Sequence, residues 1–173
     1  MKFTFVPDYI FNTFDEVSVD FLQKNNIKAV ISDIDNTLEP YENAVPSQRV
    51  LKWLSSLTQQ GIACAFVSNN NNARVELFNA ELGLVAFYKA GKPFSKNVKK
   101  AMDMLGVRAE NTILLGDQVF TDVWAARNAG IRACLVPPIK DKTDVLTKFK
   151  RLLEKPVLKK YSKIHKEETE DDR

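Results

Sequence analysis

Histidine and cysteine are scarce in this chain of 173 residues, and their scarcity excludes several kinds of enzyme site. His165 is the only histidine, and it lies in a strongly charged C-terminal region. Ser-His-Asp catalysis, Cys-His catalysis and histidine-rich zinc sites all need histidine beside the reacting atoms. We therefore exclude these three kinds of site. Cys64 and Cys134 lie in apolar segments without metal-type spacing. We therefore expect two buried free thiols in a reducing cytosol.

Long apolar runs are also missing. No segment approaches the roughly 18 residues of a membrane span. The N-terminus lacks the basic start, apolar middle and cleavage site of a signal peptide, so we expect a cytoplasmic protein without a transmembrane segment. Hydrophobic residues nevertheless make up 45% of the chain, which is enough for one full core.

Five short apolar segments have the composition of buried strands. They are residues 27–32, 62–67, 84–88, 112–115 and 131–136, and they alternate with helical patterns over 46–60, 73–82, 94–105, 120–128 and 141–153. Strands alternating with helices predict an α/β fold, namely a single Rossmann-like domain in three layers around a mostly parallel five-stranded sheet. We expect an N-terminal arm over 1–26, the α/β domain over 27–154, and a charged, mobile tail over 155–173.

The arm is rich in aromatic residues and includes a possible short helix over 15–24. Two interpretations stay open: these side chains cover one edge of the core, or they form a surface that meets lipid or another protein. The tail begins within a basic region whose only acid is Glu154 and whose positive charges are Lys148, Lys150, Arg151, Lys155, Lys159, Lys160, Lys163 and Lys166. Its last seven residues carry five acids and one base, so the residues before them hold a net charge of +7.

Polar side chains follow four of the five predicted strands, at the point where each strand ends. The first strand is followed by Asp33 and Asp35, the second by Ser68 and Asn69, the third by Lys92, and the fourth by Asp117. The carboxyl ends of parallel strands face one crevice, and ligands bind there in open α/β sheets. The sequence therefore predicts that these acids, the hydroxyl and the ammonium converge on one site.

This set of groups suits phosphoryl transfer. An aspartate can attack phosphorus to form an aspartyl-phosphate, and a second carboxyl can protonate the leaving oxygen and then activate water. Carboxylates can hold Mg²⁺, while Ser68 and Lys92 can bind the phosphoryl oxygens. Simpler roles stay open for single residues: Ser68 and Asn69 as helix caps, Lys92 as a solvated lysine, and Thr37 as a turn residue. Asp117 and Asp122 can equally cap the following helix.

The residues from Asp33 to Leu38 resemble the first motif of the haloacid dehalogenase superfamily of phosphatases. The resemblance extends over about residues 27–136 and implies that Asp33 is the nucleophile. It also implies that Asp35 is the acid/base, whose main-chain carbonyl reaches Mg²⁺. Ser68 after Phe66 and Val67 resembles the second motif, a phosphate-binding position that Asn69 extends.

Two further motifs complete this resemblance. Lys92, between Gly91 and Pro93, is similar to the third motif. Gly116-Asp117-Gln118, with Thr121-Asp122, is similar to the fourth motif. This likeness implies that Asp117 binds Mg²⁺ and that Asp122 orients a metal-bound water or Lys92. Gln118 stands where some relatives carry a second acid, which shifts the supporting role to Asp122.

The spacing between these motifs leaves no room for a cap domain over the crevice. Asp35 and Ser68 are separated by 32 residues, and Ser68 and Lys92 by 23, which the predicted loop, helices and strands already occupy. An open crevice admits water, so it suits a substrate whose own bulk covers the site.

Within the superfamily the chain resembles the YqeG-like branch of subclass IIIA, which is similar to the phosphatidylglycerophosphate phosphatases of mitochondria and plastids. This resemblance rests on three segments, which are Val6-Pro7-Asp8, Asp33 to Pro40, and Gly116-Asp117-Gln118 with Thr121-Asp122. It implies a lipid phosphomonoester as substrate and an anionic phospholipid at the membrane surface as partner, with a peripheral location at the inner face of the membrane. The aromatic arm and basic tail are compatible with that location.

Two other functions stay open. The chain can be a phosphatase of a soluble sugar, nucleotide or protein phosphate. It can also be a non-enzymatic phospho-acceptor like a response-regulator receiver, although such a domain needs an aspartate after the third strand, where this chain has Lys89. Nucleic acid is not expected as a partner, because the basic residues are not interleaved with stacking aromatic residues.

Overall fold

Six parallel strands form the sheet in the described part of this computed structural model, which comprises residues 5–140 and 155–163. The strands are β1 (Tyr9–Ile10), β2 (Ala29–Ser32), β3 (Ala63–Val67), β4 (Val85–Phe87), β5 (Thr112–Gly116) and β6 (Arg132–Leu135). Their order across the sheet is β1-β6-β5-β2-β3-β4. The parallel sheet confirms the predicted α/β class, but the prediction of five strands is wrong.

The additional strand is β1, which comes from the N-terminal arm and pairs with β6 at the edge of the sheet. Asp8 N donates to Ala133 O at 2.9 Å, and Phe11 N donates to Leu135 O at 3.0 Å. A two-residue strand is too short to show an alternating pattern, and its partner lies more than a hundred residues away. Nothing local in the sequence therefore distinguishes it from a loop.

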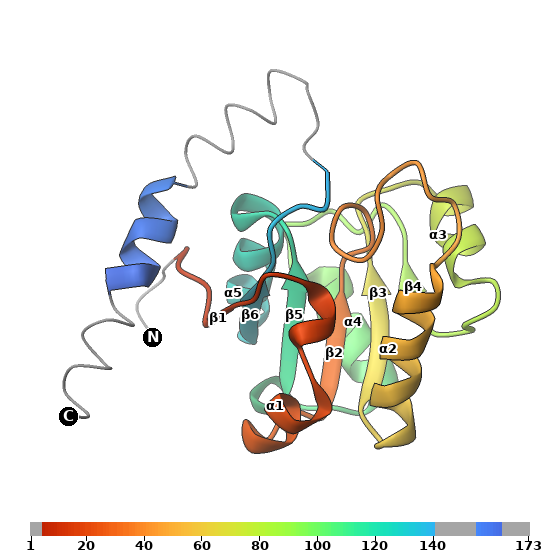
Figure 1. Cartoon of the computed structure of the whole chain (residues 1–173), viewed down its shortest axis with the longest axis horizontal. Coiled ribbons are helices and arrows are strands. Elements are labelled where there is room, and N and C mark those ends of the chain that lie inside the picture. Colours follow the sequence, from red (N-terminus) through yellow and green to blue (C-terminus); the bar gives the residue numbers. More distant parts are fainter. Residues whose placement is uncertain (1–4, 141–154, 164–173) are drawn as a thin grey trace.

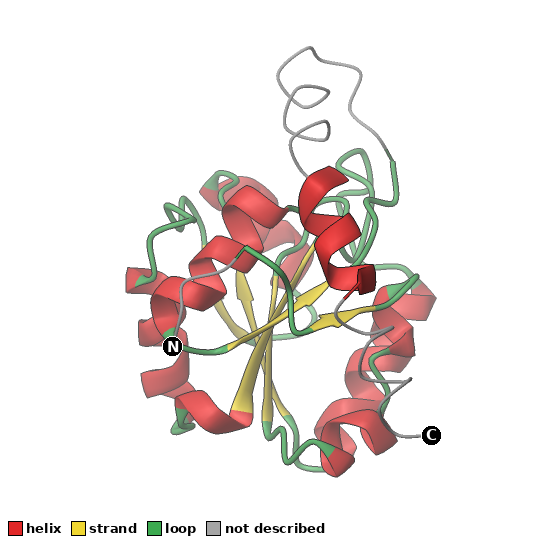
Figure 2. Ribbon diagram, turned by 90° about the vertical axis from the view of Figure 1, so that its left-hand side faces the viewer, coloured by secondary structure: helices red, strands yellow, loops and turns green. Residues whose placement is uncertain are grey.

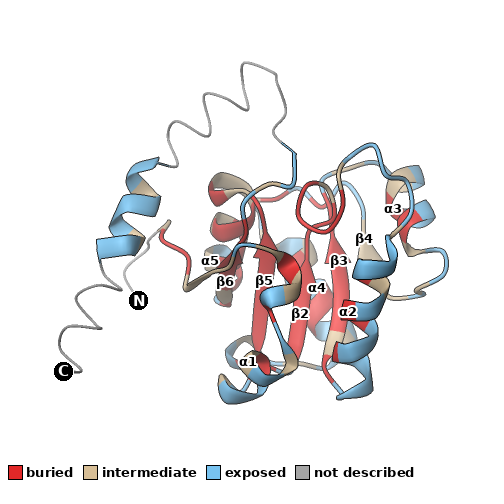
Figure 3. Cartoon of the chain, in the orientation of Figure 1, coloured by how far each residue is buried: buried red, intermediate tan, exposed pale blue. Residues whose placement is uncertain are grey.

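Helices cover both faces of the sheet, as the edge-on view shows (Figure 2). They are α1 (Val19–Lys24), α2 (Gln48–Gln59), α3 (Asn72–Asn79), α4 (Lys96–Leu105) and α5 (Trp124–Ala129). Neighbouring strand residues alternate between two apolar clusters: Val30 packs with residues of α1, α2 and α3, and Ile31 packs with residues of α4 and α5. The four central strands β2, β3, β5 and β6 are almost entirely buried, the edge strands β1 and β4 are half-buried, and the outer helix faces are exposed (Figure 3), as a central parallel sheet requires.

Helix boundaries follow local capping chemistry. The Ser47 and Asn71 side chains accept hydrogen bonds from the backbone N–H groups of Val50 and Arg74, which fixes the starts of α2 and α3. Ser68 is therefore not the N-cap of α3. The helix predicted over 120–128 is in fact two elements: a π-helical turn, η3 (Val119–Val123), leads into α5.

The aromatic arm packs inward in its described part. The rings of Tyr9 and Phe11 each meet Phe21 edge-on, at centroid distances of 4.8 and 4.9 Å. Phe14, which lies in a 3₁₀ turn (η1, Phe14–Glu16), meets Trp53 of α2 in the same way at 5.3 Å. These contacts favour the interpretation of the arm as a cover for the core edge, because edge-to-face pairs stabilise beyond the area they bury.

The helix predicted over 141–153 lies outside the described residues, and so does most of the charged tail. Residues 155–163 form a largely exposed helix, in which Val157 contacts the apolar cluster beneath α4 and α5. The predicted domain limits at residues 26 and 154 stay predictions. No helix in the described ranges is long and apolar enough to cross a bilayer.

Both cysteines are buried and free, as predicted. Burial raises the pKa of the Cys64 thiol to about 12.

Candidate active site

A cleft of about 260 Å³ opens at the carboxyl ends of the central strands. Its lining consists of Asp33, Asp35, Asn36, Tyr41, Ser68, Asn69, Asn70 and Gln118. A larger cavity of about 350 Å³ lies on the other side of the loop that follows β2, between the N-terminal arm and the Pro137-Pro138 segment. Its single carboxylate, Glu39, is already hydrogen-bonded to Asn43 and Ser47 N, so the acid chemistry belongs to the smaller cleft.

The loop after β2 is tightly closed on itself, and this closure aims Asp33 and Asp35 into the cleft. Asn36 has a φ of 62°, a left-handed conformation that asparagine tolerates better than most residues. Its N–H donates to Glu39 O at 2.7 Å, while Leu38 N and Glu39 N both donate to Ile34 O. The chain thus leaves the pleat of β2 directly after Asp33.

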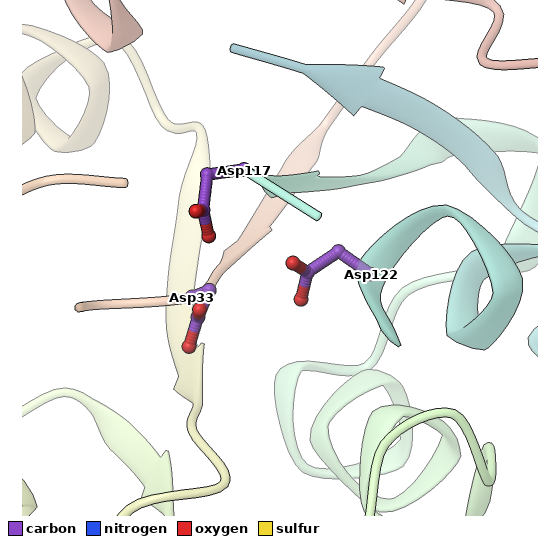
Figure 4. Close-up of side chains that lie close together, drawn as sticks. All are labelled: Asp33, Asp117 and Asp122. Carbon is purple, nitrogen blue, oxygen red and sulfur yellow. The ribbon is translucent and has the colours of Figure 1, made fainter. Parts of the chain in front are cut away.

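Three buried carboxylates meet at this edge of the sheet. Oxygen atoms of Asp33, Asp117 and Asp122 lie within 4.8 Å of one another. Asp33 and Asp117 follow the neighbouring strands β2 and β5, and Asp122 points toward them from the helical segment after β5 (Figure 4). Thr37 Oγ1 donates to Asp117 Oδ1 at 3.3 Å, which links the first motif to the fourth. Like charges at this separation repel strongly unless a cation lies between them.

Lys92 supplies one such cation. Its Nζ lies 2.9 Å from Asp33 Oδ1 and 2.6 Å from Asp122 Oδ1, and its side chain is only 2% exposed. Burial disfavours the charged amine, but the carboxylates of Asp122 and Asp33 outweigh this effect and raise the pKa of Lys92 above its usual value. Lys92 is therefore a permanent positive charge beside Asp33.

The titration of Asp33 reflects the same cluster. Burial raises the pKa of Asp33 to about 6, Lys92 opposes that rise, and the charge of Asp122 adds to it. The carboxyl group is thus costly to ionise in the protein alone, so additional positive charge at this position would stabilise its anionic form.

The π-helical turn η3 fixes the position of Asp122. In this turn Asp122 N and Val123 N both donate to Gln118 O, at 2.9 and 3.3 Å. Gln118 N donates in return to Asp122 Oδ2 at 3.1 Å, so a backbone contact and a side-chain contact hold the carboxylate. Single π-helical turns often occur at functional sites.

Ser68 and Asn69 lie beside Lys92, as the sequence predicts for adjacent strand ends. Ser68 Oγ accepts a hydrogen bond from Asn70 N at 3.1 Å. The Asn69 amide makes two bonds to the backbone of Lys92, donating to its O at 3.0 Å and accepting from its N at 2.8 Å. The side chain of Asn69 thus braces the Lys92 segment, a contact that the motif does not reveal.

Sequence reasoning missed the two partners of Asp35. Arg74 Nε donates to Asp35 Oδ1 at 3.0 Å, and Asn70 Nδ2 donates to Asp35 Oδ2 at 2.8 Å. Arg74 Nη1 also donates to Ala44 O at 2.8 Å, so one guanidinium ties α3 to the loop after β2. Its Nη2 is buried and has no hydrogen-bond partner in the described part of the chain. Arg74 lies in the first turn of a short helix with no clear apolar face, and this position gives no signal of its role in the sequence.

The donor set fits a hard divalent cation. Asp33 and Asp117 offer carboxylate oxygens on adjacent strand ends, whereas the Asp122 carboxylate already faces Lys92 and Gln118 N. Among the described residues this cluster contains only carboxylates, and two carboxylates without sulfur or imidazole are the ligands that Mg²⁺ takes in phosphate-handling sites. Lys92 is one cation beside the three carboxylates of Asp33, Asp117 and Asp122, and such an ion would neutralise the negative charge that remains.

The fold and this set of acids, a hydroxyl and a lysine suit an enzyme that acts on phosphate esters. A family model described as "Haloacid dehalogenase-like hydrolase" matches residues 9–136. The chain belongs to this family and is a hydrolase of phosphoric monoesters. The receiver-like interpretation is thereby excluded, in agreement with the absence of an aspartate after β4.

Named phosphatases are among the relatives. The chain is 32% identical over 158 residues to the "Probable phosphatase YqeG" of Bacillus subtilis, covering 91% of this chain and 92% of that protein. It is 29% identical over 106 residues to a glyceraldehyde 3-phosphate phosphatase of Pyrococcus furiosus, covering 56% of this chain but only 43% of that longer protein. The two relatives thus differ in how much of their own length this chain accounts for.

Solved structures share the fold. The cobalt-bound deoxy-D-mannose-octulosonate 8-phosphate phosphatase of Haemophilus influenzae superposes with a TM-score of 0.53 at 21% identity, covering 66% of this chain and 80% of that one. At this identity the likeness supports the architecture alone.

Proposed function

We propose that the protein is a Mg²⁺-dependent phosphomonoester hydrolase that works through an aspartyl-phosphate on Asp33. The observation that carries this proposal is the placement of Lys92 between Asp33 and Asp122, with Asp117 beside them, at the open carboxyl edge of the sheet. Asp33 is the carboxylate of this cluster that also lines the cleft, so a phosphoryl group can reach it from solvent.

The reaction consists of two displacements at phosphorus. A carboxylate oxygen of Asp33 attacks phosphorus, forming a new P–O bond while the bond to the leaving alcohol breaks. Asp35 donates a proton to that leaving oxygen. Asp35 then takes a proton from water, whose oxygen attacks phosphorus and breaks the bond to Asp33. Free phosphate and the original carboxylate result.

Asp35 must change partners during this cycle. Both of its carboxylate oxygens accept hydrogen bonds, one from Arg74 and one from Asn70. When Asp35 carries a proton, one of its oxygens becomes a donor, and the contact of that oxygen with Arg74 or Asn70 weakens. Arg74 and Asn70 therefore orient the carboxylate that Asp35 has between the two displacements.

The remaining groups bind the phosphoryl oxygens and the metal. Ser68 Oγ and the Lys92 ammonium face the position of the transferred group and balance its charge. Side chains of Asp33 and Asp117, with the main-chain carbonyl of Asp35, would hold Mg²⁺, which when bound neutralises charge on the nucleophile and the phosphate. Thr37 supports Asp117, and Asn69 contributes by holding the Lys92 segment.

The proposed substrate is a bulky phosphomonoester, and phosphatidylglycerophosphate is the candidate that the YqeG-like resemblance favours. The intervals where a covering domain would be inserted hold only a loop with α2 and β3, and α3 with β4. An open cleft relies on the substrate to exclude water. A protein acting on this lipid would lie in the cytoplasm and bind peripherally at the inner face of the membrane. A soluble ester is the second candidate, since a matched relative is named for glyceraldehyde 3-phosphate.

One assay separates these candidates. Purified protein with Mg²⁺ is given phosphatidylglycerophosphate in mixed micelles, and separately a panel of soluble sugar, nucleotide and protein phosphates. The proposal predicts phosphate release that a metal chelator abolishes, with a higher kcat/KM for the lipid. Preference for a soluble ester would replace the substrate and leave the hydrolase in place. Chelator-resistant activity would contradict the metal site.

A further inference from the structure

Exposed apolar side chains gather around the mouth of the cleft. Of the large hydrophobic residues that are exposed in the described ranges, five lie in loops that follow strands at the carboxyl edge. We name these five the apolar rim: Tyr41, Val45, Tyr88, Phe94 and Ile139. Phe94 is 75% exposed, more than any other large hydrophobic side chain in the described part of the chain. Water-exposed aromatic groups at an active-site mouth indicate a surface that is covered during function.

The rim is directly connected to the site. Tyr41 lines the cleft itself, and Phe94 follows Lys92 by two residues. Ile139 N donates to Asn36 O at 2.9 Å, which brings the loop after β6 against the loop after β2 (Figure 1).

Tyr88 completes the rim next to the second motif. Its neighbour Lys89 donates its backbone N–H to Asn70 O at 2.7 Å. A flat partner that covers the rim therefore also covers the entrance to Asp33.

The charge of the rim is positive. From residue 82 to residue 102 the chain carries five lysines and no acid. Two of them, Lys89 and Lys96, are exposed on the same segment as Tyr88 and Phe94. On the opposite side of the mouth the exposed Glu42 is paired with Lys140 at 2.8 Å. A surface that meets the rim must accept aromatic side chains and attract cations.

An anionic phospholipid bilayer satisfies both requirements. Aromatic rings with a polar end settle at the boundary between headgroups and acyl chains, and nearby lysines are attracted to the negative surface potential. The aromatic arm cannot supply this contact in its described part, because its rings pack against Phe21 and Trp53. The structure thus separates two groups of aromatic residues, of which only the rim faces outward.

We propose that the apolar rim, together with Lys89 and Lys96, inserts into the headgroup layer of an anionic bilayer so that the cleft opens directly onto lipid-borne phosphate. This inference rests on the proposed function, in that the substrate is a membrane lipid. It assigns membrane contact to the loops around the catalytic mouth, in contrast to the arm and the C-terminal tail.

Vesicle sedimentation of the full chain tests the proposal. Vesicles of phosphatidylcholine alone are compared with vesicles that also contain phosphatidylglycerol, at low and high salt. We expect binding to the anionic vesicles that weakens as salt rises. A Tyr88→Ser/Phe94→Ser double variant should partition at least about tenfold more weakly, because two aromatic side chains lose their burial. Lys89→Glu/Lys96→Glu should weaken binding mainly at low salt.

Met104→Ser is the matched control, since Met104 is 66% exposed at the opposite end of α4. It should bind vesicles as the unmodified protein does. Vesicle binding that survives in the Tyr88→Ser/Phe94→Ser variant overturns the proposal and transfers membrane contact to the tail. Equal binding to neutral and anionic vesicles overturns the electrostatic part.

Hydrolysis of soluble p-nitrophenyl phosphate separates this proposal from the proposed function. The Tyr88→Ser/Phe94→Ser variant should keep this activity, while its activity on lipid in vesicles falls with its binding. Soluble activity without any vesicle binding by the unmodified protein overturns the docking proposal alone. Vesicle binding without hydrolysis of any ester contradicts the proposed function alone. A third outcome is that neither the unmodified protein nor the Tyr88→Ser/Phe94→Ser variant binds vesicles, and that the variant forms a smaller oligomer in solution. This outcome assigns the rim to contact between copies of the chain and overturns membrane docking.

Discussion

Lys92 Nζ lies 2.6 Å from Asp122 Oδ1, and the two side chains are only 2% and 1% exposed. Asp122 comes from the π-helical turn after β5, and Lys92 from the loop after β4, so this pair joins two strand ends that are not neighbours in the sheet. A buried pair of this kind is costly to break, because removal of one partner leaves an uncompensated charge. It therefore fixes the ammonium in front of Asp33.

Lys92→Met should destabilise the protein strongly, because three buried carboxylates then face one another without a cation. We expect a loss of about 3–5 kcal/mol in the free energy of unfolding, measured by urea denaturation without metal. The matched control is Arg49→Met, which removes the half-exposed ion pair with Asp15 and should cost less than about 1 kcal/mol. Similar losses for both variants would contradict the proposed role of burial.

The deficit of Lys92→Met should also depend on pH. The folded-state pKa of Asp33 is raised by burial from 3.8 to about 6, so its ionisation destabilises the fold as pH rises through that range. Without Lys92, which opposes that rise, the pKa moves higher still. The difference in unfolding free energy between the variant and the unmodified protein should therefore grow between pH 5 and pH 8. A deficit that is constant over this range would contradict the assignment to charge.

Gly116→Ala tests how closely Asp122 approaches the end of β5. A Cβ at position 116 would overlap the side-chain carbons of Asp122, which are buried and cannot move into solvent. We expect a loss of about 1–3 kcal/mol in stability and a lower kcat, since Asp122 is displaced from Lys92. Unchanged stability and unchanged kcat together would show that the turn η3 relaxes freely.

The main features of the site could be predicted from the sequence because its groups come from strand ends. Asp33, Ser68 and Asp117 each follow a strand directly, and Lys92 lies in the loop after β4; a parallel sheet brings those ends together by geometry. The contacts of Arg74 could not be predicted in this way. They join a helix to a distant loop, and no local pattern encodes that distance.

The same limit applies to β1 and to the π-helical turn. The two residues of β1 gain their strand conformation from β6, not from their own propensity. The turn at Val119–Val123 reads as an ordinary helix start, because its hydrogen bonds differ from those of an α-helix by only one residue. Local preference is therefore a weak guide wherever tertiary contacts select the conformation.

Asp117→Ala should raise the Mg²⁺ concentration needed for half-maximal activity by at least about tenfold. Loss of a residue that only holds a metal ligand in place already weakens metal binding by about this factor, and loss of a ligand should cost at least as much. The reason is that Asp117 offers a buried carboxylate beside Asp33. Activity is titrated with Mg²⁺ for this variant and for Asp103→Ala, which removes an exposed acid on α4. An unchanged titration for Asp117→Ala would remove it from the ligand set.

Arg74→Ala should lower kcat because Asp35 loses the side chain that positions it. The decrease should be smaller than the roughly hundredfold contribution of a well-placed general acid, because Asp35 itself remains. Arg74 holds Asp35 while the substrate meets Asp33 and Ser68, so KM should change little. Arg74→Lys, which keeps a cation beside Asp35, should restore part of kcat. A uniform loss of active protein, with kcat per folded molecule unchanged, would show that Arg74 is only structural.

Capture of the covalent intermediate tests the central claim most directly. The protein is mixed with substrate and Mg²⁺ and quenched with borohydride, which reduces an acyl phosphate to an alcohol, and the modified residue is located by mass spectrometry. The account predicts modification at Asp33 alone, and neither modification nor turnover in Asp33→Asn. Modification at Asp35 or Asp117, or more than about a tenth of normal turnover in Asp33→Asn, would contradict nucleophilic catalysis by Asp33.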